Sequence, residues 1–188
     1  MILEAARAML HEQEVEEISL RGLARKLGVT APALYAHVED KRDLMAALAE
    51  IGYRELVESY SQIETTQPIE WLLAASRHYV RRALAEPAIF RVMFSFRPSD
   101  DSFGTYENES DAVSKALEMP LLMTEQGVKD GSIHPSHDPI HAAMALWTAT
   151  HGVASVLLLG VSEPAITEAL VDDVIGTMLA GLAAPARS

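Results

Sequence analysis

The stretch VTAPALYAHVEDKRDL, residues 29–44, decides the fold of the N-terminal part of the chain, together with the helix that precedes it. Ser19 and Thr30 are favourable N-cap residues, and each begins a short predicted helix. Pro32 falls in the first turn of the second helix, where its missing amide costs no hydrogen bond. Gly28 lies between the helices, where the backbone must turn with a positive φ. Two helices, each about two turns long, therefore meet at Gly28 in a predicted helix-turn-helix.

Side chains that can donate a hydrogen bond to a phosphate oxygen cluster around the second of these helices: Thr30, Tyr35, His37 and Lys41. In a helix-turn-helix, this helix enters the major groove while neighbouring polar groups contact phosphates. Lys41 also opens the next helix, whose N-terminal amides favour anions. Structural roles stay open, with Tyr35 as a half-buried aromatic and the pair Lys41 and Arg42 as solvated charges. The combination within one motif favours DNA contacts.

The formal net charge of the 188-residue chain is −12, which argues against indiscriminate nucleic-acid binding, because polyanions repel an acidic protein. Between residues 20 and 42, however, five basic residues stand against two acidic ones. The helix-turn-helix is therefore locally positive within an acidic chain. The absence of cysteine excludes disulfides and fits a cytoplasmic location.

Helical periodicity continues along the rest of the chain, whereas strand patterns are weak. A fourth helix is expected from Asp40 toward Tyr60, and the later helices are expected over residues 69–85, 88–96, 108–130, 138–160 and 163–183. The apolar stretch 142–161 contains threonine, histidine and serine, so a buried helix is favoured over a membrane span. The sequence predicts an all-α protein with a helix-turn-helix DNA-binding domain over 1–47. A ligand-binding and dimerisation bundle is expected over 48–188.

The segment LRGLARKLGVTAPALYAHVEDKRDLMAALAE resembles the DNA-binding domain of the TetR family of transcriptional regulators, and the run L-Y-x-H-V-x-x-K carries the likeness. Further along, PAIFRVMFS and the W-x-x-x-H-G run are similar to the subgroup named for its WHG motif. The resemblance implies an interface with DNA made by Arg21, Thr30, Ala31, Pro32, Ala33, Tyr35, His37 and Lys41. Ala31, Ala33 and Ala36 leave the recognition helix without long polar side chains, so readout would rest on thymine methyl groups and on Arg21.

The favoured function is a dimeric, ligand-responsive repressor that binds a palindromic DNA operator and is released by a small apolar effector. The alternative is a helical ligand-binding or interaction module whose helix-turn-helix no longer reads DNA. No nucleophile stands beside a base and an oxyanion donor in either half of the sequence, so an enzyme is not expected, and neither is a cofactor.

A mostly apolar effector pocket is expected in the C-terminal bundle, because helical spacing sends several large side chains inward on four helices. Its candidate residues are Trp71, His78, Phe90, Met93, Phe94, Met123, Trp147 and His151. The alternative for the pair Trp147 and His151 is ordinary core packing. Four further residues, His134, His137, Asp138 and His141, have the types of metal ligands. Prolines place most of this cluster in a loop, so capping is favoured and no metal is expected.

The two C-terminal helices carry more apolar side chains than one small domain would bury, including Met144, Val156 and Leu170. We expect residues 138–160 and 163–183 to pair with their copies in a two-fold four-helix bundle, as the resemblance also implies. The homodimer would set two recognition helices one DNA turn apart.

Overall fold

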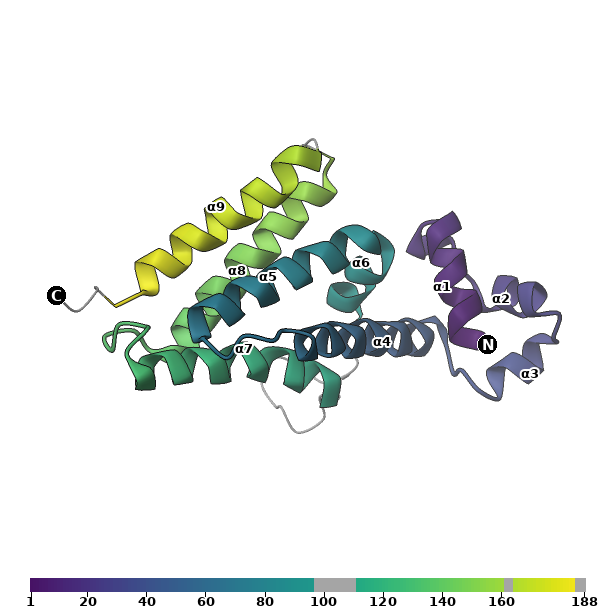
Figure 1. Cartoon of the computed structure of the whole chain (residues 1–188). Helices are drawn as coiled ribbons and strands as arrows, with labels where there is room; N and C mark the ends of the chain where they lie inside the picture. The colour runs from purple at the N-terminus through teal and green to yellow at the C-terminus, as the bar shows by residue number, and fades with distance from the viewer. Residues whose placement is uncertain (97–110, 161–163, 185–188) are drawn as a thin grey trace. The chain divides into compact units, whose positions relative to one another are not determined.

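A computed structural model describes residues 1–96, 111–160 and 164–184. This part of the chain consists of helices joined by turns and loops (Figure 1). The helices are α1 (Ile2–Glu12), the 3₁₀ turn η1 (Val15–Glu17), α2 (Leu20–Leu27), α3 (Ala31–Tyr35), α4 (Lys41–Ser61), α5 (Pro68–Ala85), α6 (Pro87–Ser95), α7 (Asp111–Asp130), α8 (Pro139–Leu158) and α9 (Pro164–Leu182). The predicted all-α fold is confirmed. None of the helices in these ranges combines the length and apolar content that a membrane crossing requires.

Most predicted helix boundaries that fall on described residues hold to within two residues. The expected helix over 108–130 begins at Asp111 in the structure, and residues 108–110 lie outside the described part, as does residue 163. The recognition helix α3 is shorter than expected. It ends at Tyr35, because the chain leaves it through a turn in which the Leu34 carbonyl accepts from the amides of His37 and Val38.

The chain divides into two compact units. The first, called the head, contains Met1–Glu55 and Glu86–Ser114, and the second, called the body, contains Leu56–Ala85 and Lys115–Ser188. The chain therefore leaves the head after Glu55 on α4 and returns to it at Glu86, just before α6.

The core of the head forms around the first four helices. Helix α1 contributes Ala6, Met9 and Leu10, which follow the three- and four-residue spacing of a helix face. The start of α4 adds Leu44, Met45, Leu48 and Ala49, all at most 1% exposed. Because α1 packs on α2 and α2 on α3, these three helices form one continuous apolar cluster.

Helix α6 lies very close to the middle of α4 within the head. A Cβ atom added at Gly52 would come within 2.6 Å of Met93 Sδ and 2.9 Å of Ile89 Cγ2, so these side chains would have to shift to admit any larger residue. One residue further on, the Tyr53 hydroxyl donates to the Met93 carbonyl over 3.1 Å. This close approach fixes where α6 lies along α4.

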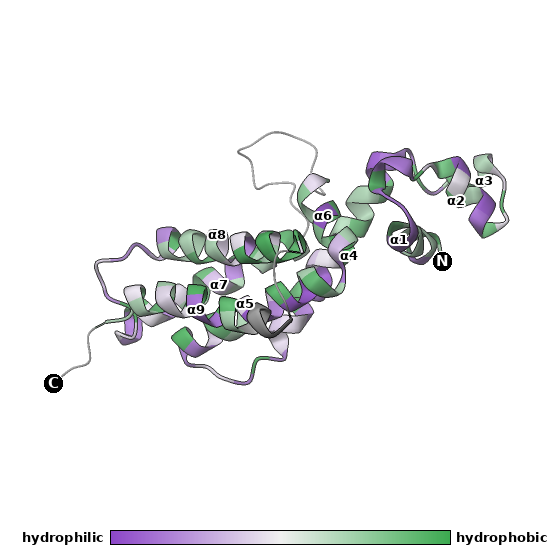
Figure 2. Cartoon of the chain, turned by 90° about the horizontal axis from the view of Figure 1, so that it is seen from above, coloured by the Kyte–Doolittle hydropathy of each residue, from purple (hydrophilic) through white to green (hydrophobic). Residues whose placement is uncertain are grey.

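The body consists mainly of α5, α8 and α9, which pack against one another, with α7 alongside. Their buried faces meet in a core of leucine, valine, isoleucine and aromatic side chains, among them Leu72, Tyr79, Leu146, Leu157, Ile175 and Leu179. Helix α8 contains no Asp, Glu, Lys or Arg, and it is largely green and pale in Figure 2.

The loop between α7 and α8 covers one end of the core of the body. Ile133 is fully buried and bridges to Ala183 at the end of α9. Its side chain fills the space above Gly127, where a Cβ atom would lie 2.7 Å from Ile133 Cδ1. The bridge ties the last turn of α9 to the loop.

Candidate functional site

The helix-turn-helix is built by capping groups that act as the sequence predicts. The Ser19 hydroxyl accepts from the Gly22 amide over 3.1 Å, and the Thr30 hydroxyl accepts from the Ala33 amide over 3.4 Å. Gly28 ends α2 with a φ of 69°, the left-handed conformation that glycine adopts without strain. Leu34 is 1% exposed and anchors α3 in the core of the head.

The predicted DNA-contacting side chains lie on the outer surface of this motif. The side chain of Tyr35 is 50% exposed, whereas that of its neighbour Leu34 is buried. The other exposed members are Arg21, Thr30, Pro32, Ala33 and His37, whereas Ala31 and Lys41 are half-buried. His37 follows the end of α3 and lies in the turn that leads to α4. Their contact with DNA stays a prediction.

Lys41 is held in place by the protein itself. Its ammonium group donates to the Glu16 carbonyl over 3.0 Å, which tethers the start of α4 to η1. Below it, the Asp40 carboxylate accepts from the Asp43 amide, and the Asp43 carboxylate accepts from the Glu39 amide. This arrangement is close to the capping box that the sequence predicts, shifted by one residue on the return bond.

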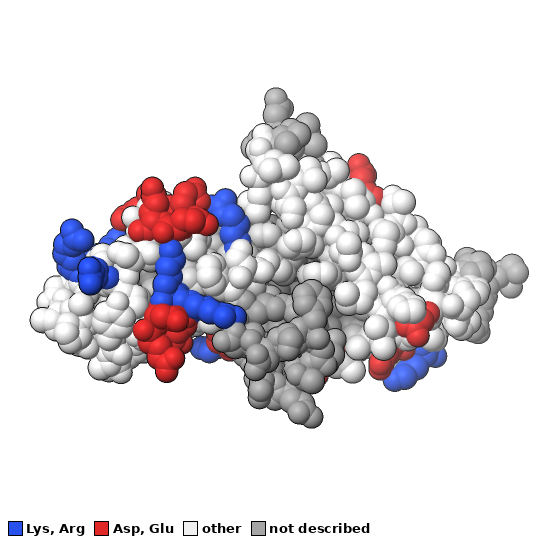
Figure 3. Space-filling view, turned by 180° about the vertical axis from the view of Figure 1, so that it is seen from behind, with Lys and Arg blue, Asp and Glu red and all other residues white. Residues whose placement is uncertain are grey.

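The helices before and after α3 carry exposed cationic side chains: Arg21, Arg25 and Lys26 on α2, and Arg42 at the start of α4. Lys26 forms an ion pair with Glu12 over 2.9 Å. Basic and acidic groups thus alternate on the head, and the face in Figure 3 shows both colours together. The electrostatic field of this surface is therefore localised and short-ranged under physiological salt.

The eight predicted effector-site residues fall into two groups. Phe90, Met93 and Phe94 belong to the head, where the two phenylalanine rings lie 5.0 Å apart and Phe94 meets Tyr53 edge-on. The body holds the other five: Trp71, His78, Met123, Trp147 and His151. Trp71 is buried against Tyr60 at 5.5 Å between ring centroids. Convergence of all eight around one space stays a prediction.

Within the body, Trp147 and His151 come together as their spacing of four residues predicts. Their rings stack at 5.5 Å between centroids with an interplanar angle of 25°. Tyr79 on α5, 4% exposed, completes the group, because its hydroxyl lies 2.8 Å from His151 Nδ1. Burial lowers the pKa of His151, so the neutral imidazole is favoured.

On the same two helices, Thr150, the residue before His151, donates to Ser76 over 3.1 Å, and both side chains are buried. Burial also lowers the pKa of His78, with a further contribution from Arg81. The contact between α5 and α8 therefore carries two hydrogen-bonded pairs inside an otherwise apolar core. Sequence reasoning missed Tyr79, because no pattern along the chain links residues 72 positions apart.

Two family models match the chain. One, described as "Bacterial regulatory proteins, tetR family", matches residues 2–48, and the other, "Tetracyclin repressor-like, C-terminal domain", matches residues 72–178. The second alone covers more than half of the sequence. The chain belongs to the TetR family of transcriptional regulators. This family is a non-enzymatic one.

Curated relatives of this TetR-family chain include the class D tetracycline repressor of Escherichia coli, 33% identical over 110 residues, which are 57% of this chain and 50% of the repressor. The chain thus matches about half the length of such repressors. An uncharacterised helix-turn-helix regulator of Mycobacterium tuberculosis is 22% identical over 96% of the chain and 79% of its own length.

Solved structures show the same fold. A protein of unknown function from Rhodococcus sp. RHA1 superposes with a TM-score of 0.83 at 25% identity, covering 97% of this chain and 93% of that one. The TetR-family regulator PfmR from Thermus thermophilus reaches a TM-score of 0.70 at 21% identity, covering 95% of this chain and 97% of its own. The order of the described helices in this TetR-family chain is therefore shared with both structures.

The histidine-rich loop before α8 is explained by local hydrogen bonds. The Asp138 carboxylate caps α8 by accepting from the His141 amide, and His134 Nδ1 lies 2.7 Å from the Ser136 hydroxyl. Over the described residues of this TetR-family chain, no group of three or more His, Asp or Glu side chains is arranged to hold a metal ion.

Proposed function

We propose that the chain is a ligand-responsive transcriptional repressor that binds a palindromic operator as a homodimer and is released by a small apolar effector. The observation that carries the proposal is the exposed helix-turn-helix face, with Arg21, Tyr35 and His37 directed to solvent inside the segment that matches the DNA-binding family model. Its curated relatives include proteins named as repressors. Such a protein would act in the cytoplasm, where its DNA is.

The small residues of α3 suggest how the operator is read. Pro32, Ala33 and Ala36 are exposed and offer apolar contact to thymine methyl groups, while Arg21 on α2 can donate to guanine. Selection of duplexes from a random pool, followed by competition between selected and random DNA, tests the proposal. Equal competition by the two would favour the alternative, a helical module that no longer reads DNA.

Dimerisation is supported by the outer surface of α8. Met144 and Val156 on this helix are 49% and 45% exposed, and Leu159, its C-cap residue, is 77% exposed. The helix carries no Asp, Glu, Lys or Arg. Such an apolar surface is unusual on a protomer that stays alone in water. Figure 3 shows a wide uncharged area on the face that it views. Association through α8 and α9 would place the recognition helices about 34–36 Å apart, one turn of DNA.

Replacing Lys41 by alanine is expected to weaken binding to selected and random DNA by similar factors. The ammonium group, released from the Glu16 carbonyl, would contact a phosphate, so its loss should lower the salt slope of log K by about one unit. Binding isotherms at several salt concentrations measure this. Lys129→Ala removes the same charge from α7 in the body and should leave the slope unchanged. An unchanged slope in Lys41→Ala would contradict the phosphate contact.

The effector site is expected to include the Tyr79–His151–Trp147 group. The chain has two tryptophans, so Trp71→Phe leaves Trp147 as the fluorescent reporter. Titration with anilinonaphthalene sulfonate, an anionic aromatic dye that binds apolar sites, should quench Trp147 and release selected DNA. Tyr79→Phe, which removes the hydroxyl partner of His151, should weaken both responses. Thr148→Val, an exposed change on the same helix, is the control. Responses that survive in Tyr79→Phe would assign this group to the core alone.

A further inference from the structure

The family model and the packing of helix α6 assign this helix to different parts of the chain. It lies within residues 72–178, which match the C-terminal family model, yet its contacts place it in the head with α1–α3 and the first part of α4. The chain crosses between the units after Glu55, again before Glu86, and a third time after Ser114. The two glutamates therefore mark the first two crossing points, one on each side of the α5 segment.

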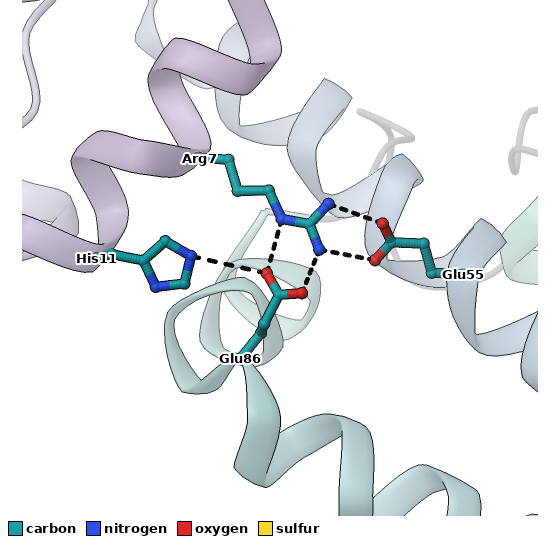
Figure 4. A network of polar contacts seen from close by, with 4 residues as sticks. All are labelled: Arg7, His11, Glu55 and Glu86. Atoms are coloured by element: carbon teal, nitrogen blue, oxygen red, sulfur yellow. Dashed lines mark hydrogen bonds and ion pairs between the residues drawn. The ribbon is translucent and has the colours of Figure 1, made fainter.

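Both crossing points are held by a single side chain, Arg7 on α1 (Figure 4). Its guanidinium donates to the two Glu55 oxygens over 2.7 and 3.0 Å. It also donates from Nε to Glu86 Oε2 over 2.6 Å and from Nη2 to Glu86 Oε1. The paired bonds on each side use the fork geometry that only arginine offers.

The environment makes this network stronger than an ordinary surface pair. The side chains of Arg7, Glu55 and Glu86 are only 25%, 27% and 21% exposed. The hydrogen bonds with Glu86, and then those with Glu55, raise the pKa of the guanidinium above its ordinary value. Glu86 is the N-cap residue of α6, yet its carboxylate does not cap the helix. Its acceptor atoms are turned to Arg7 instead.

We propose that Arg7 is a positioning residue that fixes α1, and with it the helix-turn-helix, on two of the three points where the chain passes between head and body. The inference rests on the proposed DNA-binding function. Helix α1 packs on α2 through an apolar face, so the orientation of α1 sets the orientation of the motif. A change in the spacing of Glu55 and Glu86 would act on α1 through the Arg7 guanidinium.

Two other polar links between the same segments are weaker. His11 Nε2 lies 3.9 Å from Glu86 Oε2, and His11 is half-exposed. Arg91 on α6 reaches Glu14 at 3.8 Å, with side chains 55% and 72% exposed. Exposed ion pairs at such distances contribute little, because water and salt screen them. Arg7 is therefore the residue to test.

The chain contains no cysteine, so spin labels can be placed at Glu4→Cys on α1 and Ser95→Cys on α6, both exposed and both within the head. Double electron–electron resonance on labelled protein diluted with unlabelled chain measures the distance within one protomer. No DNA is present. A failure of the proposed DNA-binding function would therefore show in the competition assay and not here.

We expect a single narrow distance peak in the parent, and loss of that peak in Arg7→Ala, with a broad or shifted distribution. Arg7→Lys keeps the charge but lacks the fork, so its peak should be intermediate in width. Arg77→Ala removes the comparable paired bonds to Asp172 in the body, and Arg91→Ala removes the exposed pair. Both should retain the narrow peak.

Arg7→Ala leaves two carboxylates facing each other, which could unfold the head. The variant Arg7→Met with Glu55→Gln and Glu86→Gln removes that repulsion, because neutral groups of similar size replace the ions. Circular dichroism should show it folded, and its distance peak should stay broad. A narrow peak in a folded Arg7→Ala or triple variant would overturn the proposal, as would equal broadening in Arg77→Ala.

Discussion

Gly52→Val is expected to lower the free energy of unfolding by about 3 kcal/mol, at the upper end of the cost of overpacking a core. The reason is the close approach of α6 to α4. A Cβ atom at this position would already lie 2.6 Å from Met93 Sδ, 2.8 Å from Met93 Cγ and 2.9 Å from Ile89 Cγ2. Urea denaturation followed by circular dichroism measures the loss.

The matched control is Ala47→Val, which places the same side chain at a half-exposed position of α4 and should cost about 0.7 kcal/mol or less through helix propensity. Truncating the clashing partner provides a second check. Gly52→Val combined with Met93→Ala should cost less than the two single changes added together, because the double variant removes the overlap. Equal stability of Gly52→Val and Ala47→Val would show that α6 does not lie as close to α4 as described.

The helix-turn-helix could be predicted from the sequence because its signals are local. Ser19 and Thr30 cap helices that start one residue later, and Gly28 supplies a positive φ between them. Each of these effects is decided within four residues of chain. The length of α3 could not be predicted from such local signals. Its end depends on how Val38, which is 7% exposed, packs in the core of the head.

What the sequence did not reveal depends on contacts between distant residues. Arg7 pairs with carboxylates 48 and 79 positions away, and Tyr79 meets His151 across 72 positions. A glutamate before a proline at a helix start is typically solvated, so nothing near Glu86 distinguishes it. Helix α6 likewise belongs to the head because it packs on Gly52. Sequence periodicity alone does not indicate this contact.

The three glycines on the outer helices of the body differ physically from Gly52. A Cβ atom at Gly152 on α8, or at Gly176 or Gly181 on α9, would have no neighbour within 4 Å, apart from its own helix backbone and chain neighbours. Packing within one chain therefore does not require glycine there, although glycine costs a helix about 1 kcal/mol relative to alanine. Close approach of a second copy, as proposed for α8 and α9, provides a reason for small residues at these positions.

Gly152→Arg is therefore expected to convert the proposed dimer to a monomer without unfolding it. Within one chain the new side chain has open space and improves helix propensity, whereas in the dimer it would bury an unpaired charge against an apolar surface. Loss of the second half-site contact should weaken binding to a selected palindromic duplex by about 10²–10⁴-fold. Sedimentation velocity and binding isotherms measure the two effects, and circular dichroism verifies the fold.

Thr66→Arg adds the same charge on an exposed loop and should leave the dimer and its affinity for the duplex unchanged. If Gly152→Arg still sediments as a dimer with parental affinity, the two-fold interface does not involve this face of α8, and the operator spacing argued from it must be abandoned.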